Sequence, residues 1–586
     1  MGTHVKYDFN TVISRLMTNS EKHDAAFRYN PELPDNFLSM TIADMDFPCP
    51  PPVLQAIKDR LEHPMLGYTL DIDYQYRRSI VGWLKRRHGW IIDPTTMVTT
   101  TGVCRALFNC IESLTKKTDG VIIQTPIYYP FYEAITAFNR TPIYNHLVHD
   151  EKGYYTIDFD DFEKKCKDPK NKLFLLCSPH NPTGRVWKEE ELRRMAEICF
   201  ANNVFIVCDE IHSDIIRTNQ KHIPLGKLYP DQENMIFCTS PSKTFNLAGN
   251  ELANIFIPKK LLWDEWESKF YTQQPNPLSM EALKAAYTKC DDWLEQIKIY
   301  LDDNFKHLDD RLNSELPESV FYPSEGTYLA WIDLSKFGLS DDELKRRITR
   351  AGLYVEYAGD FAANGEGHIR MNLACPRSIL DQGIDLLVKC LKENYEDPQY
   401  SYRFETGKKM IDFSFTTLSN ETKKLSQFFN ENNNIFKSLF LFMRSIKCPI
   451  SEFDIMNLIN DLTKETQEKG FEGKNQIFVV FPDDHSSLKK FFDGKSINFD
   501  VVSDSNRELY QLLSIKPAVN SYRLYDALAV QKLIKAENSG IERKKIEDLQ
   551  RTAYFVINSS LEVVYSHYGI GAGDTPSACQ IIESLK

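Results

Sequence analysis

The stretch TSPSKTFN at residues 239–246 follows the apolar run MIFC at residues 235–238. The apolar run predicts a buried strand, and Lys243 stands just beyond the end of that strand. An amine in such a place is partly desolvated, which lowers its pKa and makes it nucleophilic near neutral pH. The alternative is a solvated loop lysine, because Ser-x-x-Lys alone is a weak motif. Other stretches of the chain are needed to decide between the two.

Two further apolar runs end in polar turns. LFLLC at 173–177 leads into SPHNPTG at 178–184, and VFIVC at 204–208 leads into DEIH at 209–212. Both runs predict fully buried strands, and ligands of open α/β sheets lie at the carboxyl ends of such strands. An acidic side chain at such a strand end can pair with a protonated ring nitrogen of a ligand. The sequence therefore predicts a ligand site at the edge where these strands end.

A third stretch, HIRMN at 368–372, places Arg370 and Asn372 two residues apart. In a strand this spacing puts both side chains on the same face. The planar fork of an arginine is the usual partner of a carboxylate. We therefore expect Arg370 to bind an acidic group of the ligand.

These motifs resemble those of fold-type I pyridoxal-phosphate (PLP) enzymes of the aminotransferase superfamily. The resemblance covers residues 1–395, and the closer similarity is to the cystathionine β-lyase-like C–S lyase branch. It implies an α/β fold of the PLP-dependent transferase type, with a large mixed-sheet domain at about 48–288 and a small α/β domain formed by about 1–47 and 289–395. The segments that carry the resemblance are ADMDF 43–47, NPTG 181–184, DEIH 209–212, SKTFN 242–246 and RMNLACPRS 370–378.

The resemblance also implies roles for single residues. Lys243 would hold PLP as a Schiff base and, once displaced by the substrate amine, would remove the Cα proton. Asp209 would keep the ring nitrogen protonated. Asn181 would hydrogen-bond the ring hydroxyl, where His212 would assist. Arg370 would bind the substrate carboxylate.

A second group of residues is expected to hold the cofactor phosphate. A glycine followed by the start of a helix offers free N–H groups and the positive end of the helix dipole, which together make an anion site. Two serines near the lysine would add hydroxyl donors. The residues concerned are Gly102, Val103, Cys104, Ser240 and Ser242.

Two tyrosines complete the predicted site. Tyr128 lies in TPIYYP at 125–130 and, by the resemblance, stacks on the pyridine ring, although a packed core aromatic explains the sequence equally well. By the same resemblance Tyr68 reaches across a dimer interface to the cofactor of the neighbouring subunit. The alternative for Tyr68 is an ordinary surface aromatic. The first interpretation predicts a homodimer with shared active sites.

The implied reaction is β-elimination on an S-substituted cysteine, such as cystathionine, cystine or a cysteine S-conjugate, giving a thiol, pyruvate and ammonia. An aminotransferase is the alternative, because both reactions pass through the same carbanion and no motif separates them. One departure from the lyase pattern is the polar pair Asn250–Glu251. It predicts a change in the shape of the local substrate channel.

Residues 400–586 are expected to form a separate domain, because the helical periodicity breaks at 393–399. Apolar runs at 439–443, 476–481, 499–502, 553–557 and 561–565 predict strands, with helices between and after them. The pattern resembles a thioredoxin-fold domain of the peroxiredoxin-like type. RELY at 507–510 and GDTP at 573–576 fit this resemblance.

Cys448 is the candidate thiol site of this domain. It stands near the predicted start of a helix, which favours a lowered thiol pKa and a reactive thiolate. Ser451 occupies the second position of a Cys-x-x-Cys motif, so a resolving partner is missing. One interpretation is a monothiol that accepts sulfur from the lyase products. The other is a buried, inert cysteine in a structural or docking module.

The composition limits the remaining possibilities. A net charge of -12 with a pI near 5.7 disfavours a nucleic-acid partner, which needs clustered cations. No apolar run reaches membrane length, and residues 1–10 lack a signal-peptide pattern. The 13 cysteines are scattered, and an odd count argues against a disulfide framework. We therefore expect a cytoplasmic enzyme that binds a small amino acid and no metal, nucleic acid or membrane.

Overall fold

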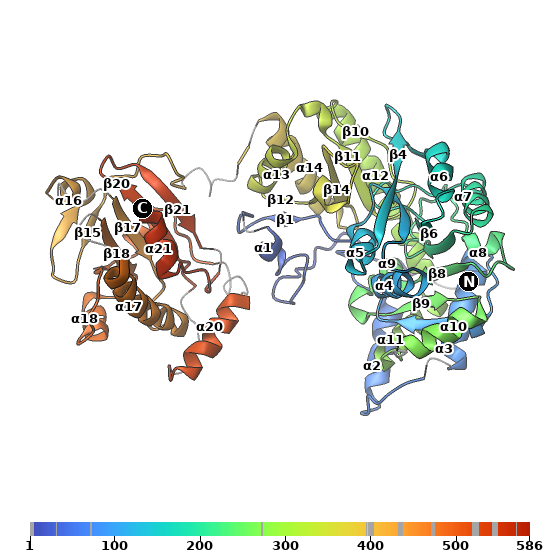
Figure 1. Ribbon diagram of the computed structural model, residues 1–586, viewed down its shortest axis with the longest axis horizontal. Coiled ribbons are helices and arrows are strands. Elements are labelled where there is room, and N and C mark those ends of the chain that lie inside the picture. The colour runs from blue at the N-terminus through green and yellow to red at the C-terminus, as the bar shows by residue number, and fades with distance from the viewer. Residues whose placement is uncertain are drawn as a thin grey trace. The chain divides into compact units, whose positions relative to one another are not determined.

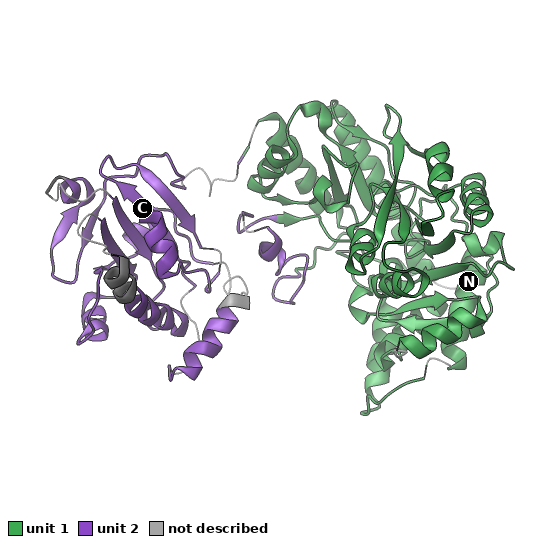
Figure 2. Cartoon of the chain, viewed as in Figure 1, with its two compact units in different colours: residues 1–14, 38–395 green, residues 15–37, 396–586 purple. Residues whose placement is uncertain are grey.

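The chain divides into two compact units in the computed structural model (Figure 1). Unit 1 comprises Met1–Ser14 and Leu38–Tyr395, and unit 2 comprises Arg15–Phe37 and Glu396–Lys586 (Figure 2). The segment Arg15–Phe37 thus packs with the C-terminal residues, whereas the sequence analysis placed it in the small domain. The expected boundary at 393–399 lies largely outside the described residues. The structure describes residues 5–30, 32–70, 73–270, 274–393, 395–396, 403–431, 437–469, 475–518, 527–541, 549–569 and 571–585.

Unit 1 is built on an eight-stranded sheet with the strand order β2-β9-β8-β7-β6-β3-β4-β5. The five strands from β8 to β4 are parallel to one another, whereas β9 and β5 run antiparallel to their neighbours. The strands are β2 Met97–Thr100, β3 Gly120–Thr125, β4 Thr141–His149, β5 Tyr155–Ile157, β6 Asn171–Cys177, β7 Phe205–Asp209, β8 Met235–Thr239 and β9 Ala253–Phe256.

Both faces of this sheet are covered, so its central strands are apolar throughout. In β6, Leu173 and Leu175 belong to one hydrophobic core, while Phe174 and Leu176 belong to the core on the opposite face. Helices α4 Val103–Leu114, α5 Tyr129–Ala137 and α10 Lys260–Lys269 contribute to the first core. Helices α3 Tyr74–His88, α6 Phe159–Cys166, α7 Glu189–Ala201 and α11 Pro277–Lys289 contribute to the second. Such two-sided burial is typical of parallel sheets and explains the unbroken apolar runs in the sequence.

The small domain contains an antiparallel sheet with the strand order β10-β11-β14-β13, which carries the arginine predicted to bind substrate. Its strands are β10 Val320–Phe321, β11 Leu329–Asp333, β13 Glu356–Tyr357 and β14 His368–Asn372. A separate parallel pair joins β1 Leu38–Ser39 to β12 Leu353–Tyr354. Helices α12 Asp291–Glu315, α13 Asp341–Arg350 and α14 Arg377–Lys392 supply apolar residues to its core.

The remaining described helices of unit 1 have 11 residues or fewer. None of the described helices of either unit is both long and apolar enough to cross a bilayer. The α-helices are α2 Pro51–Leu61, α8 Leu225–Leu228 and α9 Pro241–Thr244, and the 3₁₀ turns are η1 Pro94–Thr96, η2 Ala248–Asn250, η3 Ser335–Phe337 and η4 Ala358–Asp360.

Unit 2 contains a five-stranded sheet with the order β19-β18-β17-β20-β21, in which β17, β18 and β19 are parallel and β20 and β21 form an antiparallel hairpin. Apolar cores cover both faces of this sheet. The elements of the unit are α1 Ala26–Tyr29, β15 Ser414–Thr416, β16 Thr422–Lys424, α16 Leu425–Glu431, β17 Lys437–Phe442, α17 Pro449–Lys469, β18 Asn475–Phe481, α18 His485–Phe492, β19 Asp500–Ser503, α19 Glu508–Leu512, α20 Ala527–Asn538, β20 Ala553–Asn558, β21 Val563–Tyr568 and α21 Ala578–Leu585.

Gly184 closes the turn after β6, and we predict that Gly184→Ala destabilises unit 1 far more than Gly338→Ala. Both glycines have positive φ (69° and 67°), which costs a residue with a Cβ about 1–2 kcal/mol. At Gly184 the added Cβ would also lie 2.3 Å from Ser324 Cβ, whereas at Gly338 it would meet nothing within 4 Å. We expect the clash to add roughly 1–3 kcal/mol.

Urea unfolding followed by tryptophan fluorescence measures this difference, because all 7 tryptophans lie in unit 1. Equal losses of stability in the two variants would contradict the close approach of Ser324 to the turn.

Candidate active site

A cavity of about 310 Å³ lies where the chain leaves the parallel strands of unit 1. Segments that are far apart in the sequence contribute to its wall, and these include the residues after β2, β6, β7 and β8. Nine of the residues that the sequence analysis singled out line it together: Gly102, Val103, Cys104, Tyr128, Asn181, Asp209, His212, Ser242 and Lys243.

Lys243 reaches this cavity from α9, the short helix that follows β8. Its Nζ donates a hydrogen bond to the backbone carbonyl of Ala43 (2.6 Å), which also accepts from the hydroxyl of Tyr328 (2.7 Å). Burial lowers the pKa of the Lys243 amine below its usual value. The hydroxyl of Thr244, the next residue, donates to the buried carboxylate of Asp214 (2.9 Å). This hydrogen bond anchors α9, the helix that carries Lys243, to Asp214.

Asp209 is the last residue of β7 and presents a buried carboxyl to the cavity. Its Oδ1 accepts a hydrogen bond from the backbone N–H of Ile211 (3.0 Å). Burial raises the pKa of this carboxyl to about 7, although the nearby Lys243 acts in the opposite direction. A carboxyl with such a pKa lacks a close cationic partner and fits a ligand that brings one.

His212 lies on the same wall, three residues after Asp209. Burial lowers the pKa of its imidazole to about 3, so the ring is neutral at pH 7. Its Nδ1 is buried and has no hydrogen-bond partner among the described residues. An unpaired buried nitrogen is costly, so this atom also fits a ligand that supplies a hydrogen-bond partner.

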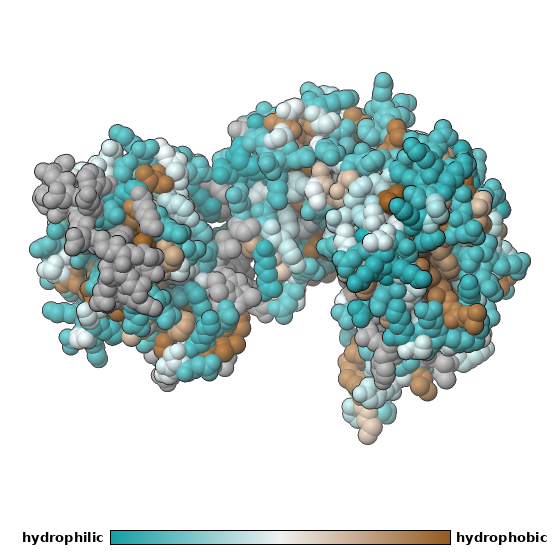
Figure 3. All heavy atoms as spheres, viewed as in Figure 1, coloured by the Kyte–Doolittle hydropathy of each residue, from teal (hydrophilic) through white to brown (hydrophobic). Residues whose placement is uncertain are grey.

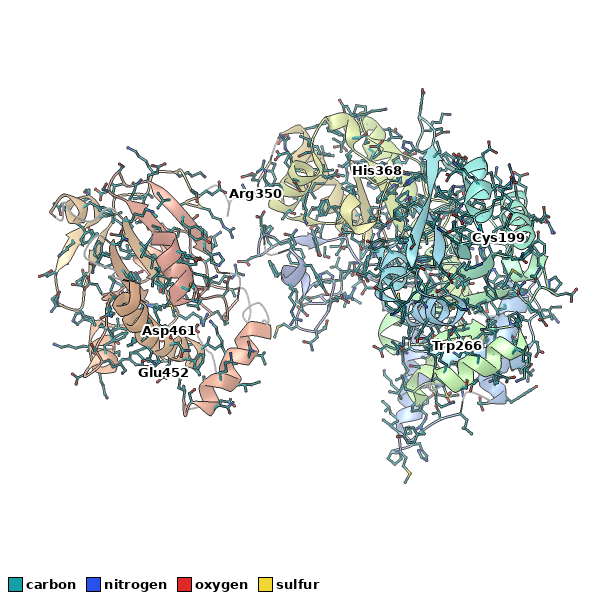
Figure 4. All side chains as sticks on the ribbon, in the orientation of Figure 1. Cys199, Trp266, Arg350, His368, Glu452 and Asp461 are labelled. Carbon is teal, nitrogen blue, oxygen red and sulfur yellow. The ribbon has the colours of Figure 1, made fainter. Side chains whose placement is uncertain are left out.

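Arg370 is not among the residues that line the cavity; it contacts the wall residue Asn181 and is almost fully buried, with 1% of its side chain exposed. Its Nη1 donates to Asn181 Oδ1 (2.7 Å), and its Nε donates to Glu356 Oε2 (2.8 Å), which also accepts from Nη2. The Asn181 oxygen is thereby engaged, which leaves its amide nitrogen as the donor toward the cavity. His368, labelled in Figure 4, lies on the same strand, β14, two residues before Arg370. Sequence reasoning missed Glu356.

The expected anion site lies at the start of α4. Gly102 is the N-cap with φ 146°, and a Cβ built on it would meet nothing within 4 Å. No side chain caps the helix, so its first N–H groups are open to a ligand. Ser242 lines the cavity, but Ser240 does not: its Oγ lies 2.7 Å from the carbonyl oxygen of Leu252 and accepts from the Ser242 N–H. The structure thus gives Ser240 the position of a helix cap.

Two charged wall residues, Arg105 and Glu251, complete the cavity. Neither side chain makes a hydrogen bond or ion pair with another described residue. Arg105 lies in the first turn of α4, where an unpaired cation opposes the helix dipole unless an anion is bound nearby. Sequence reasoning missed Arg105, whereas Glu251 belongs to the polar pair noted there. Glu251 has φ 48°, an uncommon conformation for a residue with a side chain.

Tyr128 and Tyr68 occupy contrasting positions. Tyr128 precedes α5 and lines the cavity, and burial raises its hydroxyl pKa well above the usual value. Tyr68 is fully exposed and is not a wall residue of the cavity in its own chain. An apolar projection below α2 is visible in part as brown and tan spheres (Figure 3). The exposed apolar residues at 61–70 and 73–74 are Leu61, Met65, Leu66, Tyr68, Leu70 and Tyr74.

In unit 2, Cys448 immediately precedes α17, and its carbonyl accepts the first helical hydrogen bond, from Glu452 N–H (2.9 Å). The Cys448 side chain is buried (3% exposed) in a small apolar cluster with Ile450, Ala518 and others. Ser451 is also buried, and its hydroxyl has no hydrogen-bond partner among the described residues. The position at the helix start agrees with the sequence analysis. The burial leaves little thiol surface for another molecule.

Comparison with known proteins gives matches for both units. The family model for aminotransferase class I and II matches residues 35–387, and that for the AhpC/TSA family matches residues 406–566. Cystathionine beta-lyase PatB of Bacillus subtilis is 36% identical over 352 residues, which cover 59% of this chain and 90% of PatB. Protein MalY of Escherichia coli is 31% identical over 392 residues, 66% of this chain and 99% of MalY. The PLP-bound C–S lyase of Staphylococcus hominis is 39% identical, with a TM-score of 0.63 over 66% of this chain and 99% of that structure.

We predict that Asp209 makes the stability of the cofactor-free protein fall as pH rises from about 4 to 7. The carboxyl has a pKa of about 7 in the folded chain and about 3.9 when unfolded. Within this window the folded state therefore binds more protons than the unfolded state, and each rise in pH favours unfolding. The loss is at most about 4 kcal/mol.

The isosteric variant Asp209→Asn should lack this loss. Buried histidines with lowered pKa values, such as His180, oppose the trend in both proteins and cancel in the difference. Urea unfolding at a series of pH values, read by tryptophan fluorescence, measures the difference in unfolding free energy between the wild type and the variant. A wild-type-minus-variant difference that stays constant with pH would contradict the raised pKa.

Proposed function

The chain belongs to the aminotransferase class I and II family, and we propose that it is a pyridoxal-phosphate-dependent carbon–sulfur lyase that cleaves S-substituted cysteines by β-elimination. Its products would be a thiol, pyruvate and ammonia. The observation that carries the proposal is the joint presence of a desolvated amine, Lys243, and an unpaired buried carboxyl, Asp209, on the wall of one cavity. The names of the relatives PatB and the Staphylococcus hominis enzyme favour elimination over transamination.

The residues of the wall fit pyridoxal phosphate. The carboxyl of Asp209 suits a protonated ring nitrogen, and the unpaired Nδ1 of His212 suits the ring hydroxyl. The open N–H groups at Val103 and Cys104, with the unpaired guanidinium of Arg105, suit the phosphate. When bound, the cofactor supplies an electron sink for negative charge at the substrate Cα.

Each of the remaining roles falls to a side chain of the protein. We assign to Lys243 the covalent attachment of the cofactor and the transfer of the Cα proton, because it is the amine on the cavity wall. Asp209 would hold a proton on the ring nitrogen, and the Asn181 amide would donate to the ring hydroxyl. Tyr128, on the same wall, would pack against the ring. Arg370 binds the substrate carboxylate, and this orients the Cα–H bond.

We further propose a homodimer in which Tyr68 completes the site of the neighbouring subunit. Within its own chain the tyrosine is fully exposed, in a segment rich in exposed apolar residues. An apolar projection of this kind is typical of a protein–protein contact. A cytoplasmic location is consistent with the 13 cysteines, all of which are free.

For unit 2 we propose a structural or docking role. The burial of Cys448 and the hydroxyl of Ser451 in place of a second thiol both argue against thiol chemistry of the two-cysteine kind. Mass spectrometry of the protein after turnover of cystine tests this proposal. Persulfide sulfur on Cys448 would instead support the sulfur-accepting alternative.

The test of the activity is to incubate the PLP-loaded protein with a panel of cysteine S-conjugates. We expect pyruvate and free thiol in equal amounts and little glutamate-dependent exchange of keto acids. Lys243→Ala should lose pyruvate formation by at least about 1,000-fold, because no other amine is found among the described residues of the cavity wall. It should also lose the visible absorbance of the lysine-bound cofactor. Keto-acid exchange without free thiol would identify an aminotransferase instead.

The shared site predicts complementation between two impaired variants. Tyr68→Phe should lower kcat/KM by roughly 10-fold, since one hydrogen bond to a charged group is lost. A hybrid dimer of Tyr68→Phe and Lys243→Ala subunits contains one complete site. An equal mixture should therefore regain about a quarter of the wild-type sites after subunit exchange. Activity that merely averages the two parents, or a fully active monomer, would refute the shared site.

A further inference from the structure

Glu356 forms an ion pair with Arg370 that the sequence motifs do not contain. The two residues face each other across β13 and β14, as direct partners in the antiparallel register. Glu356 Oε2 accepts from both Nε (2.8 Å) and Nη2 of Arg370. The pair is shielded from water, because 15% of the Glu356 side chain and 1% of the Arg370 side chain are exposed.

The hydrogen-bond donors of Arg370 can be counted. A guanidinium carries five N–H groups, one on Nε and two on each terminal nitrogen. Glu356 takes the Nε donor and one Nη2 donor, and Asn181 takes one Nη1 donor. One N–H then remains on each of the two terminal nitrogens. A guanidinium has two edges that each present a pair of N–H donors, the Nε/Nη2 side and the Nη1/Nη2 end. Glu356 occupies the first, so the second, the end-on fork, is the edge left to match the two oxygens of a carboxylate.

The remaining contacts of Arg370 hold the guanidinium in a single orientation. The centroid of the Phe361 ring lies 4.9 Å from its central carbon, which is within cation–π range. Glu356 also balances the charge of the buried arginine before any substrate arrives. Without that partner the free site would contain an uncompensated buried cation, which favours other side-chain conformations. The fork is therefore organised in advance of binding.

We propose that Glu356 is the positioning residue of the substrate-carboxylate subsite: it occupies the side edge of Arg370 and leaves the end-on fork for the α-carboxylate of an amino acid. The inference rests on the proposed function, in which Arg370 binds that carboxylate. Glu356 thereby contributes to the preference for S-substituted cysteines over amines that lack the carboxyl group. It touches neither the substrate nor the cofactor.

The experiment uses PLP-loaded full-length protein and two probes that share one thioether, an S-alkyl-L-cysteine and the corresponding S-alkyl cysteamine, which lacks the carboxylate. Binding is followed by the change in the visible absorbance of the cofactor, and turnover by pyruvate. For Glu356→Gln we expect an increase of about 10-fold in KM and in the dissociation constant of the cysteine conjugate. We expect less than about a twofold change in kcat and in the affinity for the cysteamine conjugate.

Two further variants control the result. Glu356→Asp keeps the charge and should recover part of the lost affinity. Glu366→Gln removes a carboxylate that is exposed, lies two residues before β14 and has no side-chain partner among the described residues, and it should bind both probes like wild type.

Several outcomes would overturn the inference. Unchanged affinity for the cysteine conjugate in Glu356→Gln would show that Arg370 is oriented without Glu356. Tighter binding would make Glu356 a competitor of the substrate carboxylate. Equal weakening toward both probes would indicate general damage to the site. If the wild type itself binds both probes equally, the carboxylate role of Arg370 fails, and if it shows no lysine-bound cofactor absorbance, the proposed function fails.

Discussion

The candidate site depends above all on the parallel register of three neighbouring strands, β6, β7 and β8. This register places Cys177, Asp209 and Cys238 side by side near the ends of the three strands. The strands run in one direction and bury both faces, so the chain leaves them at one edge, where the apolar layers stop. The turn at 178–184, the segment after Asp209 and the helix α9 all start there. Their polar side chains therefore lie close together at this edge of the sheet.

Burial at this edge then sets the charge states. Removal from water raises the pKa of Asp209 to about 7 and lowers that of Lys243. Burial therefore favours the neutral form of both groups. Each group therefore suits a ligand that provides its partner. For Asp209 the partner is a cationic ring nitrogen, and for Lys243 it is an electrophilic carbon. Arg370 is stabilised in a different way, because a guanidinium does not lose its proton in a protein and must be paired. Glu356 and Asn181 provide those partners in advance.

The sheet of unit 2 is also covered on both faces. Its junction between β17 and α17, however, differs from the strand ends that form the cavity of unit 1. The loop after β17 is tied down by Asp483, which accepts from the Ser445 hydroxyl (2.6 Å) and the Ile446 N–H (2.9 Å). Cys448 follows this loop and turns into an apolar cluster. A fold that matches the AhpC/TSA family is therefore present without an exposed thiol at that position.

The sequence by itself determined the apolar strands, the polar turns at their ends and the motifs around Lys243, Asp209, Asn181 and Arg370. These features are local: an apolar run predicts a buried strand, and the residues after it must lie at the sheet edge. The sequence also predicted a second domain, whose sheet is present in unit 2.

Only the tertiary structure decided the pairing of Arg370 with Glu356, the position of Arg105 on the cavity wall and the use of Ser240 as a helix cap. It also placed Arg15–Phe37 with the C-terminal residues, where Asp35 accepts from Arg551 (2.6 Å). Each of these depends on the register between strands or on contacts between distant segments. Local periodicity contains no information about such contacts, because it records which face of an element is buried and not which side chain it meets there.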